Sequence, residues 1–416
     1  MSDALPVSVV VVSRDRPDAL KRCLTGVSQM RYPAFEVVVV ADKDGAAAAE
    51  ALPFARDLKI VPFDQANISS ARNLGISHAA GDVIAFIDDD AVPEPSWLTH
   101  LAAPFARDDI AAAGGFVRGR NGISFQNKAR SVDARGYTEE IEVTSEGATV
   151  FIPKAQRAIK TEGTNMAVRR DVLVTLEGFD PAFAFFLDET DLNLRLARAA
   201  LATAVVPTAQ VHHGYAASPR RRSDRVPSDL FDIGASWAVF QRKYLPEPDR
   251  PNHWRELRAG ERNRVLRHMT AGRLEAGAVR GLLRRLDQGY TQGLERRRGG
   301  AALSKTPVQE FRPMPVATGP SRFFAGRVWQ ASDLRAQARA AVDAGDIATV
   351  LILSPTALYH RHSFAAEGFW EQRGGIWGRS ERSAPLIQPC SFSGRVSREL
   401  ARLAKLRLLY VHDQHH

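Results

Sequence analysis

Residues 82–90 read DVIAFIDDD, an apolar segment that runs straight into three adjacent carboxylates, Asp88, Asp89 and Asp90. The apolar part has the length and composition of a buried strand. Three neighbouring carboxylates repel one another, so a site that keeps them together usually supplies a cation. Oxygen ligands of this kind suit Mg²⁺ or Mn²⁺ shared with substrate phosphates. The alternative is a polar turn that caps a helix predicted over Pro93–Ala106, because aspartate is also a good N-cap.

Similar apolar segments precede this stretch and alternate with helix-like ones. The predicted strands are Val7–Ser13, Phe35–Ala41 and Leu58–Pro62, and the predicted helices are Asp18–Met30 and Ile68–Ala79. This alternation predicts a doubly wound α/β domain with right-handed crossovers.

Polar residues gather where these strands end. Ser13, Asp42 and Asp88–Asp90 all follow an apolar run directly. Ligands of such sheets bind beyond the carboxyl ends of the strands. We therefore expect a ligand at this edge. The gathering of polar residues at several strand ends also favours a cation site, rather than a helix cap, as the role of Asp88–Asp90.

The rest of the chain divides by composition. We predict a catalytic domain over 1–225, a basic helical region over 226–300, a proline-rich linker over 301–320 and a small α/β region of unknown role over 321–416. The net charge is +9, and the segment Arg220–Arg298 alone carries 19 basic and 10 acidic residues. Such a block can meet nucleic acid, an anionic membrane or nucleotide phosphates, or it can be a set of solvated helices.

Two cysteines, Cys23 and Cys390, make neither a disulfide framework nor a zinc cluster, so we expect a reducing cytosol. We expect no secretory signal, since Met1–Pro6 is not basic and no apolar stretch follows it. No apolar run reaches the roughly 18 residues that a membrane span needs.

Further motifs follow in a fixed order. They are VVVVAD ending at Asp42, NISSARNLG at 67–75, IDDD at 87–90, GTNMA at 163–167, DETDLNLR at 188–195 and HHG at 212–214. Over about residues 5–245 the chain resembles the family 2 glycosyltransferases, whose fold is the GT-A type. The resemblance implies a mixed α/β sheet of the kind that binds nucleotide-diphospho-sugars.

The resemblance also implies roles for single residues. Asp42 would accept a hydrogen bond from the base, Arg72 would contact the nucleotide, and Asp88 would hold the ribose or the sugar. Asp90 would ligate the Mn²⁺ or Mg²⁺ that bridges the diphosphate.

Further roles follow from the same resemblance. Ser13 and Asp89 would help to bind the nucleotide-sugar, while Thr164 and Asn165 would line the donor-sugar or acceptor pocket. One of His212 and His213 would complete metal or diphosphate binding, because neighbours on a strand point to opposite faces. The run Arg220–Arg222 either closes over the diphosphate or is a basic loop.

The catalytic base is expected in the pair Asp188–Glu189. In the family an acidic pair opens a helix in the order Glu-Asp, which this chain inverts, and position favours Glu189 over Asp188. Single displacement needs a carboxylate within reach of the acceptor hydroxyl, and the metal stabilises the leaving diphosphate. Taken alone, the two acids would be ordinary first-turn residues of a helix.

Other classes of protein fit less well. An oxidoreductase would need a glycine-rich turn after the first strand, where this chain has Ser13–Pro17, SRDRP. No P-loop is present, and neither is the Gln-x-x-Arg-Trp motif expected of processive synthases. The missing motif favours transfer of a single sugar, and the resemblance implies an inverting transfer to a hydroxyl of a glycan or lipid-linked acceptor, in cell-surface polysaccharide synthesis.

A binding protein is the alternative from another class. It would use the basic block on a membrane or a nucleic acid, with a non-catalytic nucleotide-binding α/β domain. Many relatives use lipid-linked acceptors at the inner face of a membrane. We therefore expect a cytoplasmic protein that contacts an anionic membrane surface, and nucleic acid is the less favoured partner.

Overall fold

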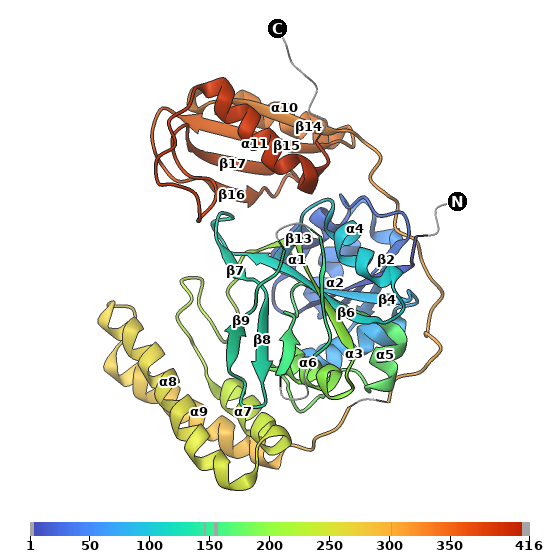
Figure 1. Ribbon diagram of the computed structural model, residues 1–416, viewed down its shortest axis with the longest axis vertical. Helices are drawn as coiled ribbons and strands as arrows, with labels where there is room; N and C mark the ends of the chain where they lie inside the picture. The colour runs from blue at the N-terminus through green and yellow to red at the C-terminus, as the bar shows by residue number, and fades with distance from the viewer. Residues whose placement is uncertain (1–3, 145–146, 154–156, 301, 410–416) are drawn as a thin grey trace.

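A computed structural model describes residues 4–144, 147–153, 157–300 and 302–409 (Figure 1). Its main sheet has the strand order β10-β13-β6-β12-β4-β1-β2-β3. The strands are β1 (Val7–Ser13), β2 (Phe35–Ala41), β3 (Leu58–Pro62), β4 (Val83–Asp88), β6 (Ile110–Arg118), β10 (Thr149–Phe151), β12 (Met166–Arg169) and β13 (Ala202–His213). Strands β4, β1, β2 and β3 are parallel, whereas β12 runs antiparallel to both β4 and β6.

The valine-rich strands are buried on both faces of this sheet. Along β1, Val9 and Val11 join one hydrophobic core while Val10 and Val12 join the other, as the period of two in a strand requires. Helices cover the two faces: α1 (Pro17–Val27), α2 (Lys43–Glu50), α3 (Ile68–His78), α4 (Trp97–Ala102), α5 (Arg170–Thr175) and α6 (Asp188–Arg198). The predicted α/β class with a mixed sheet is confirmed.

Some predicted elements are wrong. The aspartate triplet is followed by a short strand, β5 (Ala91–Pro93), and not by a helix over Pro93–Ala106. Helix α4 begins only at Trp97, and a 3-10 turn, Ala103–Ala106, follows it. Strand β13 continues across an irregularity between Val206 and Gln210, and its pairing with β6 resumes beyond it.

A second, three-stranded sheet fills the region that looked irregular in sequence. It has the order β11-β8-β9, with β8 (Arg130–Asp133), β9 (Thr138–Glu140) and β11 (Arg157–Lys160), and β7 (Phe125–Asn127) joins the main sheet beside β6. The short, charged strands of this sheet have little apolar periodicity, which is why the sequence did not reveal them.

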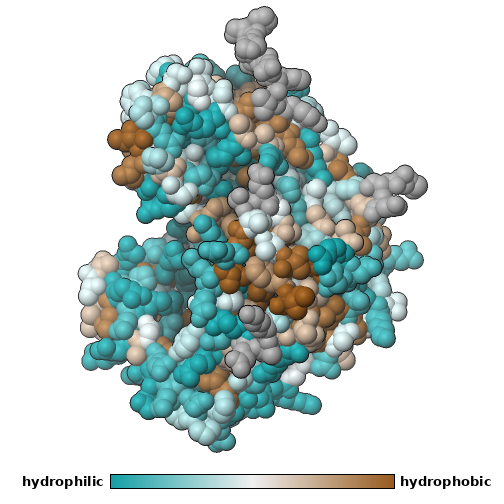
Figure 2. All heavy atoms as spheres, in the orientation of Figure 1, coloured by the Kyte–Doolittle hydropathy of each residue, from teal (hydrophilic) through white to brown (hydrophobic). Residues whose placement is uncertain are grey.

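The basic region folds as three helices, α7 (Phe231–Tyr244), α8 (Arg250–Thr270) and α9 (Ala276–Glu295). Helices α7 and α9 lie so close that a Cβ on Gly289 would meet the carbonyl oxygen of Phe231 at 1.9 Å. Over α8 and α9 the visible surface is mostly hydrophilic (Figure 2).

Residues 302–320 contain neither helix nor strand, and a C-terminal unit follows. Its sheet has the order β14-β15-β17-β16, with β14 (Ser321–Arg327), β15 (Ile347–Ser354), β16 (Arg361–Phe364) and β17 (Trp370–Gly375). It also contains α10 (Ala331–Asp343) and α11 (Phe392–Arg407), and it lies beyond the ends of β7 and β13 (Figure 1). Among the described residues, no helix has the length and apolar character to span a bilayer.

Candidate active site

Three side chains that the topology brings together could hold a metal ion. Asp88 ends β4, Asp90 precedes β5 and His213 ends β13, and one ligand atom from each lies within 4.8 Å of the others. The pairing of β5 with β13 sets Ala91 opposite His213, and Gly214 donates its N–H to the carbonyl oxygen of Asp90 at 2.7 Å. A short two-stranded ladder therefore fixes two of the three ligands.

The ring of His213 is held at both nitrogens. Nδ1 lies 2.8 Å from Oε1 of Gln126, and Nε2 lies 3.0 Å from Oδ1 of Asp90. Burial alone would raise the pKa of Asp90. The hydrogen bond from His213 and the charge of Arg16 have the larger, opposite effect, so the pKa lies below its usual range. Two carboxylates and one imidazole whose second nitrogen is held by Gln126 form a donor set that suits Mn²⁺.

Asp89, the middle member of the triplet, lies away from these ligands. Its side chain is 0% exposed, accepts a hydrogen bond from Ser13 Oγ at 2.7 Å and pairs with an Arg16 amino group at 2.7 Å. Burial, partly offset by Arg16, raises the pKa of Asp89 to about 7. The structure therefore does not bring Asp89 to a ligand surface, and its contacts orient Ser13 and Arg16.

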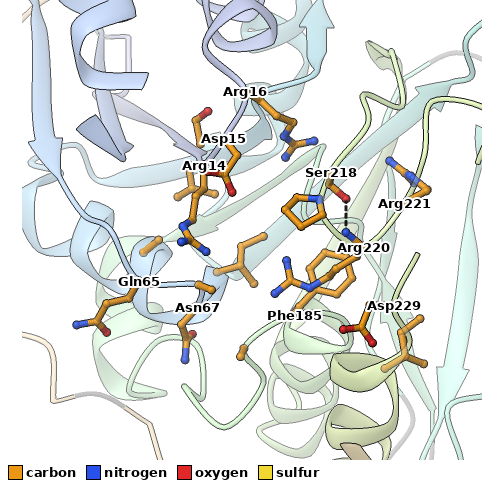
Figure 3. Close-up of a pocket in the computed structure, with 18 of the residues that line it drawn as sticks. Arg14, Asp15, Arg16, Gln65, Asn67, Phe185, Ser218, Arg220, Arg221 and Asp229 are labelled. Atoms are coloured by element: carbon orange, nitrogen blue, oxygen red, sulfur yellow. Dashed lines mark hydrogen bonds between the residues drawn. The ribbon is translucent and has the colours of Figure 1, made fainter. Parts of the chain in front are cut away.

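A cavity of about 250 Å³ opens beside the triplet, between the end of β1 and the segment that follows β13. Arg14, Arg16, Arg220 and Arg221 approach it from these two sides (Figure 3). Arg16 also lies 3.3 Å from Oδ2 of Asp90, so one residue both lines the cavity and contacts a candidate metal ligand. Sequence reasoning missed Arg14 and Arg16, although they follow the same strand end that singled out Ser13.

Asp42 lies at the same sheet edge but does not line this cavity. Its Oδ1 caps α2 by accepting from the Gly45 N–H at 2.9 Å, and its Oδ2 accepts from the Asp15 N–H at 2.8 Å. Contact with a nucleotide base therefore stays a prediction for this residue.

Asp188 and Glu189, the two candidates for the catalytic base, open α6, and basic side chains contact both of them. Arg72, from α3, is hydrogen-bonded to Asp188 and lies 3.3 Å from Asp88, so it joins the two acidic clusters. Lys160 pairs with Glu189 at 2.9 Å. Burial raises the pKa of Asp188 to about 7 despite Arg72, whereas Lys160 outweighs burial and lowers the pKa of Glu189 to about 2.

Part of the chain matches the model of a known protein family. The model described as "Glycosyltransferase like family 2" matches residues 5–225, about half of the chain. The chain belongs to this family. The predicted family and the predicted type of enzyme, a glycosyltransferase, are confirmed.

Two curated bacterial proteins are similar to parts of this glycosyltransferase. The O-antigen biosynthesis protein RfbC of Myxococcus xanthus is 28% identical over 257 residues, which cover 58% of this chain and 20% of RfbC. The succinoglycan biosynthesis protein ExoM of Rhizobium meliloti is 33% identical over 142 residues, which cover 32% of this chain and 45% of ExoM. The chain thus spans less than half the length of either relative.

A solved mannosyltransferase from Pyrobaculum calidifontis, in complex with GDP-Man and Mn²⁺, aligns more fully but less closely. The alignment covers 71% of this chain and 88% of that one, with 16% identity and a TM-score of 0.41.

Two residues that were predicted to line a sugar pocket, Asn165 and Thr164, are buried in this glycosyltransferase. Asn165 is fully buried, accepts from the Trp97 ring N–H at 2.8 Å and donates to the carbonyl oxygens of Phe116 and Ala209. These contacts use its amide, so the structure does not place it in a pocket. Thr164 is also buried, but its hydroxyl has no hydrogen-bond partner among the described residues.

His212 is not part of the metal cluster. Its Nε2 lies 2.8 Å from Oε1 of Glu94, and its ring lies 4.8 Å from that of Trp370 in the C-terminal unit. The structure therefore selects His213 from the pair, because adjacent residues of β13 point to opposite faces. Trp370 is buried as well, and it packs with Val92 and Phe364.

Proposed function

We propose that this glycosyltransferase moves one sugar from a nucleotide-diphosphate sugar to a hydroxyl of a glycan or lipid-linked acceptor, with inversion at the anomeric carbon. The observation that carries the proposal is the cluster of Asp88, Asp90 and His213 beside an arginine-lined cavity. The two curated relatives are named for O-antigen and succinoglycan biosynthesis, and we propose polysaccharide synthesis as the context of this reaction.

In this proposal Asp88, Asp90 and His213 would hold Mn²⁺ or Mg²⁺, and the imidazole favours Mn²⁺. When bound, the ion would supply positive charge that stabilises the leaving diphosphate. Arg16 and Arg221 both line the cavity, where they would bind the phosphate oxygens. Arg220 is turned toward Asp232, at 2.6 Å, and stacks on Phe185, so it shapes the cavity wall.

We propose Glu189 as the base and Asp188 as a positioning residue. The side chain of Glu189 is 17% exposed, whereas that of Asp188 is 3% exposed and is held by Arg72. A base must reach the acceptor hydroxyl, which favours Glu189. Lys160 keeps Glu189 ionised, and the low pKa limits the strength of Glu189 as a base. We therefore expect it to contribute about 100-fold to the rate, the lower end of the range for general bases.

Thermal unfolding with UDP, GDP and dTDP, each with and without Mn²⁺, tests the proposal. Ligands that bind the folded state raise Tm by mass action. We expect a rise with one nucleotide that needs Mn²⁺ and disappears in Asp90→Ala, which would also identify the donor class. If none of the three nucleotides shifts Tm, the proposed donor site is wrong.

We also propose that the protein works on the cytoplasmic side of a membrane, with α8 and α9 against anionic lipid. Arg262, Arg267, Arg280 and Arg284 of these helices are exposed. Basic helices bind anionic lipid in a salt-sensitive way. Sedimentation with phosphatidylserine vesicles should bring the protein down at low salt. Equal binding to RNA, with the same dependence on salt, would instead show unspecific attraction between charges.

A further inference from the structure

The two strands that hold metal ligands are also the place where the C-terminal unit docks. At one end of the β5·β13 ladder lie Asp90 and His213. At the other end Glu94 follows β5, and its N–H donates to the carbonyl oxygen of Gln210 in β13 at 3.1 Å. The ladder is only three residues long, so a short hydrogen-bonded pair of strands joins Glu94 at one end to the metal ligands at the other.

A charged contact from the C-terminal unit holds the far end of this ladder. Arg407, at the end of α11, donates from Nε to Oε2 of Glu94 at 2.9 Å and from an amino group to Oε1 at 3.2 Å. Both side chains are almost completely buried, and His212 completes the group through its bond to the same carboxylate. A buried bidentate pair has a narrow range of geometries, so it fixes the position of Glu94.

An apolar contact holds the middle of the ladder. Val92 of β5 forms a buried cluster with Phe364 and Trp370 of the C-terminal unit. The guanidinium of Arg407 lies 4.3 Å from the centre of the Trp370 ring, and the His212 ring lies 4.8 Å from it. On the opposite side, α1 packs so closely that a Cβ on Gly26 would meet Val92 at 2.4 Å. The ladder is therefore held between α1 and the C-terminal unit.

We propose that the C-terminal unit acts in the reaction by positioning the metal ligands, through Arg407 on Glu94 and Trp370 on His212 and Val92. Its residues touch no reacting atom, and they act through the β5·β13 ladder. The inference rests on the proposed function, because it assumes that Asp88, Asp90 and His213 bind a metal. It gives a role to the unit that the sequence left without one.

Titration of the full-length protein with Mn²⁺ alone, followed by electron paramagnetic resonance of the free ion, tests this proposal. We expect Arg407→Gln and Trp370→Leu each to weaken Mn²⁺ binding about tenfold, as for other residues that orient metal ligands. Arg407→Lys keeps a cation beside Glu94 and should recover part of that loss. All titrations are made well below the Tm of each variant.

Leu351→Ala provides the matched control, because Leu351 is buried in a different core of the same unit with Leu353 and Ile376. It should lower Tm and leave Mn²⁺ affinity unchanged. Wild-type affinity in both Arg407→Gln and Trp370→Leu, or an equal loss in Leu351→Ala, would overturn the inference and leave the proposed function standing. A wild-type protein that binds no Mn²⁺ would overturn the metal site and this inference together.

Discussion

The acidic cluster at the end of β4 and the one at the start of α6 have similar electrostatics. In the first, burial raises the pKa of Asp89 to about 7 while contacts hold that of Asp90 low. In the second, the pKa of Asp188 is about 7 and that of Glu189 is about 2. Each cluster therefore has one carboxyl that protonates readily and one that stays ionised.

The two clusters differ in the cations that surround them. Asp90 faces His213, a neutral ligand when deprotonated, and shares its ion-binding space with Asp88. Glu189 faces Lys160 and Asp188 faces Arg72, cations that the chain itself supplies. Arg16 also reaches Asp90, at 3.3 Å, but Asp88, Asp90 and His213 lie close enough together to share a metal ion, whereas Asp188 and Glu189 are each paired with a cation of the chain. Similar pKa patterns can therefore serve different chemistry. Arg72 touches both clusters and sets their separation.

Removing a ligand from the first cluster should have the largest effect. Asp90→Asn keeps the shape of the side chain but removes the charge that faces the metal, so kcat should fall by about 1,000-fold. Steady-state rates of donor turnover over a range of Mn²⁺ concentrations measure this loss. Asp89→Asn is the control, because its carboxyl contacts Ser13 and Arg16 and not the metal ligands. An equal fall in both variants would contradict the distinction between the two aspartates.

The second cluster should be separable into its two acids. Glu189→Gln removes the proposed base, and kcat should fall by about 100-fold, the lower end of the range for general bases. Asp188→Asn can still accept a hydrogen bond from Arg72 and should lower kcat by less than about tenfold. Single-turnover rates at saturating donor give both values. If the order is reversed, Asp188 is the base.

The sequence predicted the first cluster more completely than its surroundings. The apolar run before Asp88 and the strand ends at Ser13 and Asp42 placed the site at one edge of the sheet, because parallel strands end together. Residues that reach the site from distant segments were not predictable in this way. Lys160 comes from a short charged strand, and its distance to Glu189 depends on how the small sheet packs on α6.

The C-terminal unit shows the same limit. Its strand Ile347–Ser354 is continuous and apolar, a pattern that by itself predicts a buried strand. The contact of Arg407 with Glu94 spans more than 300 positions in the chain, and nothing in the local pattern of either segment indicates it. Local periodicity predicts elements, whereas the side chains that join two units depend on how those units dock.

Removing the built-in cation from Glu189 should change the pH dependence of the reaction. Lys160 lowers the pKa of Glu189, so Lys160→Met raises it. A base works only when deprotonated, so activity is present above its pKa and is lost as the pH falls through it. We expect little change at pH 7.5 and a several-fold loss near pH 5, seen as an upward shift of the acid limb of kcat/KM. Lys21→Met, an exposed lysine on α1, should leave the profile unchanged.

The smallest effect should come from a change beside Arg72, the residue that joins the clusters. A Cβ on Gly163 would lie 2.4 Å from an Arg72 amino group, and this guanidinium cannot swing freely because Asp88 and Asp188 hold it. Gly163→Ala should therefore shift Arg72 slightly and lower kcat by about fivefold, below the ~100-fold that a 1 Å misplacement can cost. Gly281→Ala, in α9 with no atom within 4 Å of the added Cβ, should keep the wild-type kcat. A wild-type kcat in Gly163→Ala as well would mean that the spacing of the two clusters does not depend on the position of Arg72.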